Sequence, residues 1–284
     1  MLKDKHICIV GLGVLGGSYA KALAKVGILA DAVDIDEEAL HMATENGWIA
    51  KGSTDPSLVK EADLVIVCLY PHTFLHWIDD NAKYLKAGTV LTDVTGVKRA
   101  IVDKVNKVLP TEVEYIACHP MAGRESSGLA YADEKCFAGA NFIIVPTVYN
   151  RPQTIAMMEE MAEMLGFGKV CRLTPEKHDR MIGFLSQLTH VIAVALMNTA
   201  DNTDLADYTG DSFRDLTRIA NINEKLWPEL FVLNKDQLIG EIDGFVKEML
   251  SFKELIEKED YAEMENRMRI ATSRRKCFDK KVKK

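Results

Sequence analysis

The glycine-rich turn at residues 11–16 constrains the fold of this chain more than any other segment. The turn, Gly11-Leu12-Gly13-Val14-Leu15-Gly16, follows a short apolar run and begins an amphipathic stretch. In that setting the first glycine permits a tight turn, the second lets a ligand approach the backbone, and the third allows close helix–strand packing. The N-terminus of the helix would then offer free N–H groups and partial positive charge to a phosphate. The segment therefore predicts the first strand, turn and helix of a nucleotide-binding sheet.

An acidic residue after the second apolar run indicates which nucleotide is bound. Asp34 lies 23 positions after Gly11, where a carboxylate accepts hydrogen bonds from the adenosine ribose hydroxyls. A carboxylate there repels a 2′-phosphate, and residues 35–38 supply no arginine to offset it. We therefore predict a site for NAD rather than NADP. Its expected contacts are Gly11, Leu12, Gly13, Leu15, Gly16 and Asp34.

The chain is expected to form two domains of different class. Up to residue 173, β-branched runs alternate with amphipathic helical stretches, which is typical of a parallel sheet wrapped by helices. Strands are expected at 6–10, 31–35, 63–69, 89–94, 114–118, 141–145 and 169–173, and helices at 17–26, 37–46, 72–85, 98–108 and 154–165. Thr174-Pro175-Glu176 is a strong helix start, and helical spacing continues beyond it. We predict a Rossmann-type α/β domain over 1–173 and an all-α domain over 174–284 that forms a homodimer.

Composition excludes several classes of protein. The net charge of −7 over 284 residues offers no basic face for nucleic acid. Six cysteines are scattered without a C-x-x-C pair, which favours reduced thiols and a cytoplasmic location. We identify no uncharged apolar stretch of about 18 residues, so we expect no membrane span. We also find no His or Cys at metal-ligand spacing, and expect no metal site.

Polar residues stand at the ends of three neighbouring predicted strands. Ligands of doubly wound sheets bind at the carboxyl ends of the strands, so Tyr70, Pro71 and Asp93 are assigned to the cofactor side. His119 follows an apolar run and precedes Pro120. Its neutral imidazole could accept an alcohol proton while a hydride leaves the same carbon. A histidine that only caps a backbone carbonyl is the alternative, but the nucleotide motif upstream favours catalysis.

The helical half of the chain carries weaker signals. His190 shares a face with Ser186 and Gln187, and this cluster is either a core hydrogen-bond network or the wall of a pocket. His178 lies 12 positions before His190, which on a regular helix means about 18 Å along the axis and about 120° around it, so the two could not share a metal ion. The residue after His178, Asp179, is interpreted as structural. Arg214 and Arg218 share one helical face and could hold carboxylates, although solvated surface charge is the alternative.

Taken together, several segments resemble the prephenate/arogenate dehydrogenase family over nearly the whole chain. They are GLGVLGGS, TDVTGVK, HPMAGRESSG, EKHD, SQLTH and SFRDLTRIA. The resemblance implies a Rossmann domain followed by a helical dimerisation domain. It also implies NAD-dependent oxidative decarboxylation of prephenate to 4-hydroxyphenylpyruvate in tyrosine biosynthesis, or of arogenate to tyrosine.

The resemblance implies a role for individual residues. His119 corresponds to the catalytic histidine that bonds the ring hydroxyl, and Arg218 to the arginine that holds a substrate carboxylate. The other implied site residues are Thr95 beside the hydroxyl, Ser186 and His190 in the pocket, Trp227 near the substrate side chain, and Glu125 pairing with Arg214 and Asp215 as a gate.

Two departures from the family pattern affect the pocket. A serine that contacts the ring hydroxyl in many members is replaced here by Gly96, so that Thr95 or a water would have to substitute. The usual SHLPH reads SQLTH, which keeps His190 but puts Gln187 in place of the first histidine.

Two other functions fit parts of the pattern. A β-hydroxyacid dehydrogenase would need a lysine on the long helix, and none lies between Gly183 and Asp201. A catalytically silent NAD-binding regulator would not need His119, His190 and Arg218 together.

Overall fold

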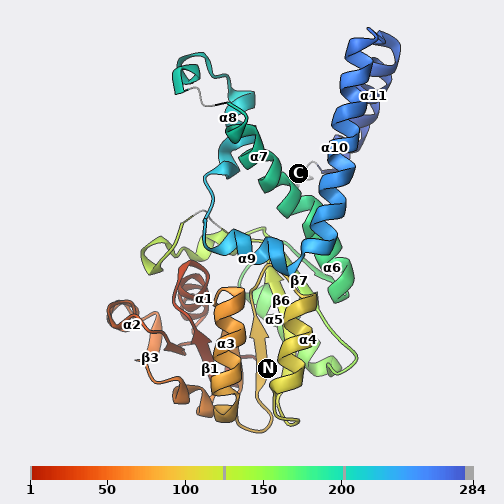
Figure 1. Cartoon of the computed structure of the whole chain (residues 1–284). Coiled ribbons are helices and arrows are strands. Elements are labelled where there is room, and N and C mark those ends of the chain that lie inside the picture. The colour runs from red at the N-terminus through yellow and green to blue at the C-terminus, as the bar shows by residue number, and fades with distance from the viewer. Residues whose placement is uncertain (1, 124–125, 201–202, 279–284) are drawn as a thin grey trace, which may run out of the picture. The chain divides into compact units, whose positions relative to one another are not determined.

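The larger part of the molecule is built on one eight-stranded sheet. The computed structural model describes residues 2–123, 126–200 and 203–278, and the chain divides into two units, Met1–Lys235 and Asp236–Lys284. In the first unit the strand order is β3-β2-β1-β4-β5-β6-β7-β8 (Figure 1). The strands are β1 Ile7–Val10, β2 Ala30–Val33, β3 Ile49–Ser53, β4 Leu64–Val67, β5 Val90–Asp93, β6 Glu114–Pro120, β7 Asn141–Val145 and β8 Lys169–Arg172. This order, with its reversal next to β1, confirms the predicted doubly wound Rossmann-type sheet.

The sheet differs from the prediction in three respects. The edge strand β3 was not predicted, because Ile49 is the one buried residue of its five and it lacks an apolar run. The strand β7 runs antiparallel to β6, so the sheet is parallel only as far as β6. That pairing also extends β6 by two residues, so His119 lies inside the strand opposite Ile143 rather than after the strand end.

Helices cover both faces of the sheet (Figure 1). They are α1 Val14–Lys25, α2 Glu37–Glu45, α3 Pro71–Asn81, α4 Arg99–Val108 and α5 Pro152–Met164. Alternate residues of β1 point to opposite faces, so Ile7 and Ile9 belong to the core under α1, α2 and α5, and Cys8 and Val10 to the core under α3 and α4. Burial on both faces explains why the strands are almost continuously apolar. Because the helices cover the two faces, the carboxyl edge of the sheet is where a ligand can reach the strand ends.

After β8 the described residues of the first unit form helices and the turns between them. Thr174 caps the first of them, because its hydroxyl accepts the Lys177 N–H. The helices are α6 Pro175–Ile182, a π-helical turn over Gly183–Leu188, α7 Thr189–Asn198, α8 Asp211–Thr217, a 3-10 turn over Arg218–Ala220, and α9 Leu226–Leu233. The helical spacing that the sequence shows in this region is interrupted at Asn234, between α9 and the helix that follows it.

The second unit is formed by two helices. They are α10, Lys235–Glu257, and α11, Tyr261–Arg275. Arg267 on α11 joins them, since its guanidinium donates to Glu248 Oε1 at 3.1 Å and to Ser251 Oγ at 3.0 Å. The predicted all-α character of the chain after β8 is confirmed for the described residues.

One expectation about membranes rested on a wrong premise. The segment Pro175–Asn198 is long and apolar enough to cross a membrane by length and composition, with a mean hydropathy of 1.5 over its 18-residue window, of which 28% is buried. It was missed because Ser186, Gln187, Thr189 and His190 interrupt the apolar run. Length and composition alone are weak evidence for a membrane span. The same segment supplies one wall of a pocket at the carboxyl edge of the sheet.

Candidate active site

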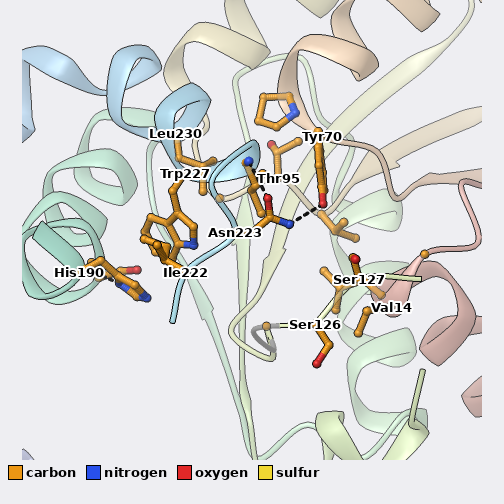
Figure 2. A pocket seen from close by; sticks show the side chains of 18 of the residues that line it. Val14, Tyr70, Thr95, Ser126, Ser127, His190, Ile222, Asn223, Trp227 and Leu230 are labelled. Carbon is orange, nitrogen blue, oxygen red and sulfur yellow. Dashed lines mark hydrogen bonds between the residues drawn. The ribbon is translucent and has the colours of Figure 1, made fainter. Parts of the chain in front are cut away.

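A pocket of about 450 Å³ opens at the carboxyl edge of the sheet. Its walls come from the glycine-rich turn, from the ends of β4, β5 and β6, from the π-helical turn, and from residues 218–230. In Figure 2, His190 and Trp227 stand on one side, and Tyr70, Ser127 and Val14 stand on the other. Of the predicted site residues, the lining includes Gly13, Leu15, Tyr70, Pro71, Thr95, His119, Ser186, His190, Arg218 and Trp227. Segments far apart in the sequence therefore meet at one site.

The glycine-rich turn has the geometry of a phosphate-binding cradle. Gly11 has a φ of 92°, and a Cβ there would lie 2.8 Å from the Cys68 carbonyl oxygen. A Cβ on Gly16 would lie 1.7 Å from the Gly11 carbonyl oxygen, so no side chain fits between helix and turn. A Cβ on Gly13 would meet nothing within 4 Å. Gly13 thus leaves open the space through which a pyrophosphate would reach the N-terminus of α1.

The carboxylate of Asp34 is fixed beside this turn. Its oxygens accept the Leu12 N–H and, at 2.9 Å, the Asp36 N–H. Each carboxylate oxygen has a second lone pair, so both can also accept a ribose hydroxyl. The turn and this carboxylate fit a dinucleotide.

His119 is the first of three bonded groups. Its Nδ1 lies 2.9 Å from Nε2 of His178, and Nδ1 of His178 lies 2.8 Å from Oδ1 of Asp179. His178 and Asp179 are buried, whereas His119 is half-buried and reaches the pocket. Burial lowers the pKa of His119 well below its usual 6.5, and His178 and Lys98 lower it further. Burial also lowers the pKa of His178, against the opposing effect of Asp179. Both imidazoles are therefore neutral near pH 7.

A second buried network lies under the end of β5. Asp93 accepts from Lys98 Nζ at 2.7 Å and from the Tyr115 hydroxyl at 2.8 Å, and it also bonds the Thr95 hydroxyl. Asp93 is fully buried and is not among the residues that line the pocket, although we predicted a cofactor contact for it. Thr95 does line the pocket, but its hydroxyl is held by Asp93 and by the Val97 carbonyl at 2.9 Å.

The far end of the pocket is aromatic and cationic. The rings of His190 and Trp227 are stacked, with centroids 3.6 Å apart and planes at 30°. His190 Nδ1 lies 2.8 Å from the Ser186 carbonyl oxygen, so this nitrogen donates and the ring is fixed. Arg218 completes the lining here.

The structure does not bring the whole predicted set together. Arg214 and Asp215 are exposed and are not among the lining residues, and Arg214 instead bonds Asp211 at 3.2 Å. The predicted gate residue Glu125 lies outside the described residues. Within the described ranges, no group of three or more His, Cys, Asp or Glu side chains could hold a metal ion.

The cluster of Ser186, Gln187 and His190 fills both roles that the sequence left open. All three residues line the pocket, and the buried Gln187 also uses its amide in the core. Its Nε2 donates to the Leu230 carbonyl at 2.9 Å, and its Oε1 accepts from Asn234 at 2.7 Å. The π-helical turn places the residues after it about 100° around the axis from where a regular α-helix would put them.

Sequence reasoning missed three contributors to the site. His178 was not assigned a role, although its position next to Asp179 was the available signal. Asn223 donates to the Tyr70 hydroxyl at 2.8 Å, and nothing in its surroundings in the sequence indicated this (Figure 2). Leu230 packs where a side chain at position 96 would stand, since a Cβ on Gly96 would lie 3.3 Å from its Cδ2.

Comparisons with known proteins agree with this geometry. Residues 19–171 match the family model described as "Prephenate dehydrogenase, nucleotide-binding domain", and residues 174–270 match "Prephenate dehydrogenase, dimerization domain". The chain is 29% identical over 268 residues to prephenate dehydrogenase of Bacillus subtilis, with 91% of this chain and 72% of that protein covered. It is 27% identical over 266 residues to cyclohexadienyl dehydrogenase of Zymomonas mobilis, with 90% of each covered.

A solved structure supports the same assignment over nearly the full chain. The crystal structure of prephenate dehydrogenase from A. aeolicus, in complex with hydroxyphenyl propionate and NAD+, superposes with a TM-score of 0.88 and 29% identity, and the match covers 97% of this chain and 98% of that one. Both the sheet and the helical region are therefore shared. The chain belongs to the prephenate dehydrogenase family.

Proposed function

We propose that this protein catalyses the NAD-dependent oxidative decarboxylation of prephenate to 4-hydroxyphenylpyruvate in tyrosine biosynthesis. As a member of its family the chain is an NAD-dependent oxidoreductase. The observation that carries the proposal is the meeting of His119, Arg218 and the Gly13 turn at one pocket of about 450 Å³. The structural relative with hydroxyphenyl propionate and NAD+ bound supports it, because that ligand resembles the aromatic product.

The chemistry assigns a role to each part of the pocket. NAD would supply the hydride acceptor, and the glycine-rich turn would hold its pyrophosphate and Asp34 its adenosine ribose. His119 accepts the proton of the ring hydroxyl while the hydride leaves the same carbon, and the O–H electron pair forms the carbonyl. The C–C bond between the ring and its carboxylate then breaks and CO2 leaves. The electron pair of that bond stays with the ring and makes it aromatic. His119 returns the proton to the phenolate oxygen, so no net proton is consumed.

Arg218 and the stack of His190 on Trp227 orient the substrate in this proposal. A guanidinium holds a carboxylate by charge-assisted bonds, and the indole offers a flat apolar surface to the ring or its side chain. Ser186 adds a polar group on the same wall. Thr95 supports Asp93 and the strand end rather than the substrate, because its hydroxyl is already bonded. The gate that Glu125 would form with Arg214 and Asp215 stays a prediction.

Arogenate is the second candidate substrate. The Zymomonas relative is a cyclohexadienyl dehydrogenase, and arogenate differs from prephenate by an ammonium group on the side chain. Among the described residues that line the pocket, the cationic side chain is Arg218 and no carboxylate is present. Both side chains carry a carboxylate, so a cationic wall without a carboxylate favours the uncharged keto group of prephenate over the ammonium group of arogenate.

We also propose that the protein is a cytoplasmic homodimer, with no membrane or nucleic-acid partner. The family model that matches residues 174–270 is a dimerization domain. On α6, the π-helical turn and α7, the side chains of Met181, Phe184, Leu185 and Met197 are between 44% and 52% exposed. An apolar face of this kind is normally covered by a partner. Analytical ultracentrifugation should therefore give twice the chain mass of 31.7 kDa, and a monomer would contradict the proposal.

The test of function is the rate of NADH formation at 340 nm. Prephenate and arogenate are each supplied with NAD and with NADP, to the wild type and to His119→Asn. We expect turnover with prephenate and NAD, and a fall in kcat of about 10²-fold or more in the variant. His41→Asn is the matched control, because His41 is a surface histidine on α2 with 72% of its side chain exposed. Turnover with neither substrate, or an unchanged kcat in His119→Asn, would refute the proposal.

A further inference from the structure

We infer that His178, held by Asp179, is a positioning residue that fixes which nitrogen of His119 carries the proton. The inference deepens the proposed function and depends on it for the identity of the substrate. Three groups stand in series: His119 Nδ1 is 2.9 Å from His178 Nε2, and His178 Nδ1 is 2.8 Å from Asp179 Oδ1. The series connects β6 to the first turns of α6, on the two sides of the predicted domain boundary at residues 173 and 174.

The hydrogen-bond partners determine where the protons are. Asp179 is surrounded by donors, since Oδ1 accepts the Lys98 N–H at 2.8 Å and Oδ2 accepts the Arg99 N–H at 2.9 Å. The carboxylate therefore acts as an acceptor, and His178 Nδ1 must carry a proton. A neutral imidazole with a proton on Nδ1 has a lone pair on Nε2. His119 Nδ1 must then donate to it, which leaves the lone pair of His119 on Nε2, the nitrogen that a general base needs.

The end of the series is rigidly held. Asp179 caps the N-terminus of α4, whose own N-cap residue, Lys98, makes no side-chain cap bond. The Asp179 backbone carbonyl accepts from Asn234 Nδ2 at 2.9 Å, and Asn234 is fully buried. A carboxylate held by the Lys98 and Arg99 N–H groups, on a residue whose backbone is bonded to Asn234, can orient an imidazole in the way that the aspartate of a catalytic triad does.

His119 depends on this support more than a histidine with a hydroxyl neighbour would. At Gly96, where the resembled family often has a serine, there is no side chain to bond the ring. The Thr95 hydroxyl is held by Asp93 and Val97. The bond that the structure shows to the His119 ring comes from His178.

A purely structural role for the pair is the alternative, because Asp179 also caps α4. Substitutions at His178 separate the two roles. In His178→Gln the side-chain oxygen can stand near the position of Nε2 and still accept from His119. In His178→Asn the side chain is too short to reach His119 but can still bond Asp179. Asp179→Asn is isosteric, and its amide can donate to His178 and reverse the proton order of both rings.

The kinetic test compares these variants at equal stability. We expect His178→Asn and Asp179→Asn to lower kcat by about 10²-fold or more, with KM for prephenate within about threefold of the wild-type value. His178→Gln should recover at least tenfold of the lost kcat, and the surface variant His41→Asn should match the wild type. A structural role alone would move thermal stability and would give no recovery with Gln. Equal kcat in His178→Asn and the wild type would overturn the inference.

A second measurement does not depend on turnover. Long-range ¹H–¹⁵N correlation spectra of histidine-labelled wild-type protein distinguish protons on Nδ1 from protons on Nε2. His119→Asn and His178→Asn identify the two signals, and we expect a proton on Nδ1 in both rings. A proton on Nε2 of His119 would overturn the inference even if prephenate is the substrate. Conversely, the expected spectrum together with no turnover would uphold the hydrogen-bond series and refute the proposed function.

Discussion

Lys98 Nζ and Asp93 Oδ2 lie 2.7 Å apart, and neither side chain has any exposed surface. The pair is completed by the Tyr115 hydroxyl, which donates to Asp93 Oδ1 at 2.8 Å. A buried ion pair contributes little compared with a well-packed apolar pair, but removing one partner leaves an uncompensated charge in the core. Because Lys98 also precedes α4 and faces Asp179 through its backbone, the pair connects the end of β5 to the His119 support.

Lys98→Met should therefore destabilise the protein strongly. The expected loss in the free energy of unfolding is about 3–5 kcal/mol, because the Asp93 carboxylate is left buried without its cation. The matched control is Lys104→Met, since Lys104 pairs with Asp79 at 3.0 Å on the surface with both side chains about 40% exposed. That exposed pair should contribute less than about 1 kcal/mol. Chemical denaturation measures both variants, and equal losses would contradict this account.

Two glycines of the turn should respond differently to the same substitution. Gly16→Ala places a Cβ 1.7 Å from the Gly11 carbonyl oxygen, so the turn must distort and both stability and NAD binding should fall. Gly13→Ala meets no atom of the protein within 4 Å and has a φ of −66°, which alanine adopts readily. It should keep the melting temperature and raise the Kd for NAD by about tenfold or more, because the methyl group occupies the phosphate approach. Calorimetric titration with NAD and thermal unfolding would decide, and unchanged binding in Gly13→Ala would argue against the cradle.

Trp227→Ala should weaken substrate binding through the loss of the stacked surface. The indole lies on the His190 ring with centroids 3.6 Å apart, and removing it frees the imidazole and opens the pocket wall. We expect KM for prephenate to rise by about tenfold with a smaller change in kcat. Trp227→Phe keeps an aromatic face and serves as the matched control, with KM within a few-fold of wild type. A selective fall in kcat in Trp227→Ala would contradict a role in binding.

The pH profile should show a base that stays neutral well into the acid range. Burial, then His178, then Lys98 lower the pKa of His119 below 6.5, so kcat/KM should stay constant through pH 6.5 and fall only at lower pH. The free energy of unfolding should also fall as the pH is lowered. An unfolded histidine binds a proton below its usual pKa of 6.5, whereas His119 and His178 resist protonation in the folded state, so acid favours unfolding in that window. Steady-state rates and denaturation between pH 5 and 8 test both, and an acid limb centred above pH 6.5 would contradict the first.

The sequence was sufficient for seven of the eight strands and for the pocket residues that stand at strand ends. Tyr70, Thr95 and His119 could be placed together because consecutive parallel strands bring their carboxyl ends to one edge. Edge strand β3 could not be found, because an edge strand with exposed side chains has no apolar pattern. The antiparallel direction of β7 was missed because an apolar run of five residues reads the same in either direction.

The helical side of the site was less accessible to prediction for a physical reason. His178 and His190 were placed about 120° apart by assuming a regular helix, and the π-helical turn between them reduces that angle to about 20°. Contacts such as Asn223 to Tyr70 join residues 153 positions apart and follow from no local pattern. The support of His119 by His178 belongs to the same class, since it depends on how the helix docks against the sheet.

The π-helical turn cannot be replaced by regular α-helix without a consequence for the pocket. Closing Gly183–Leu188 into regular α-helix without deleting a residue would give an uninterrupted helix with better local hydrogen bonding. The same change would rotate the rest of the helix by about 100° and carry His190 away from the wall it shares with Trp227. A regular helix at this turn would therefore disrupt the wall of the pocket. We expect a redesign that maximises helix content at this turn to give a more stable helix and an inactive enzyme.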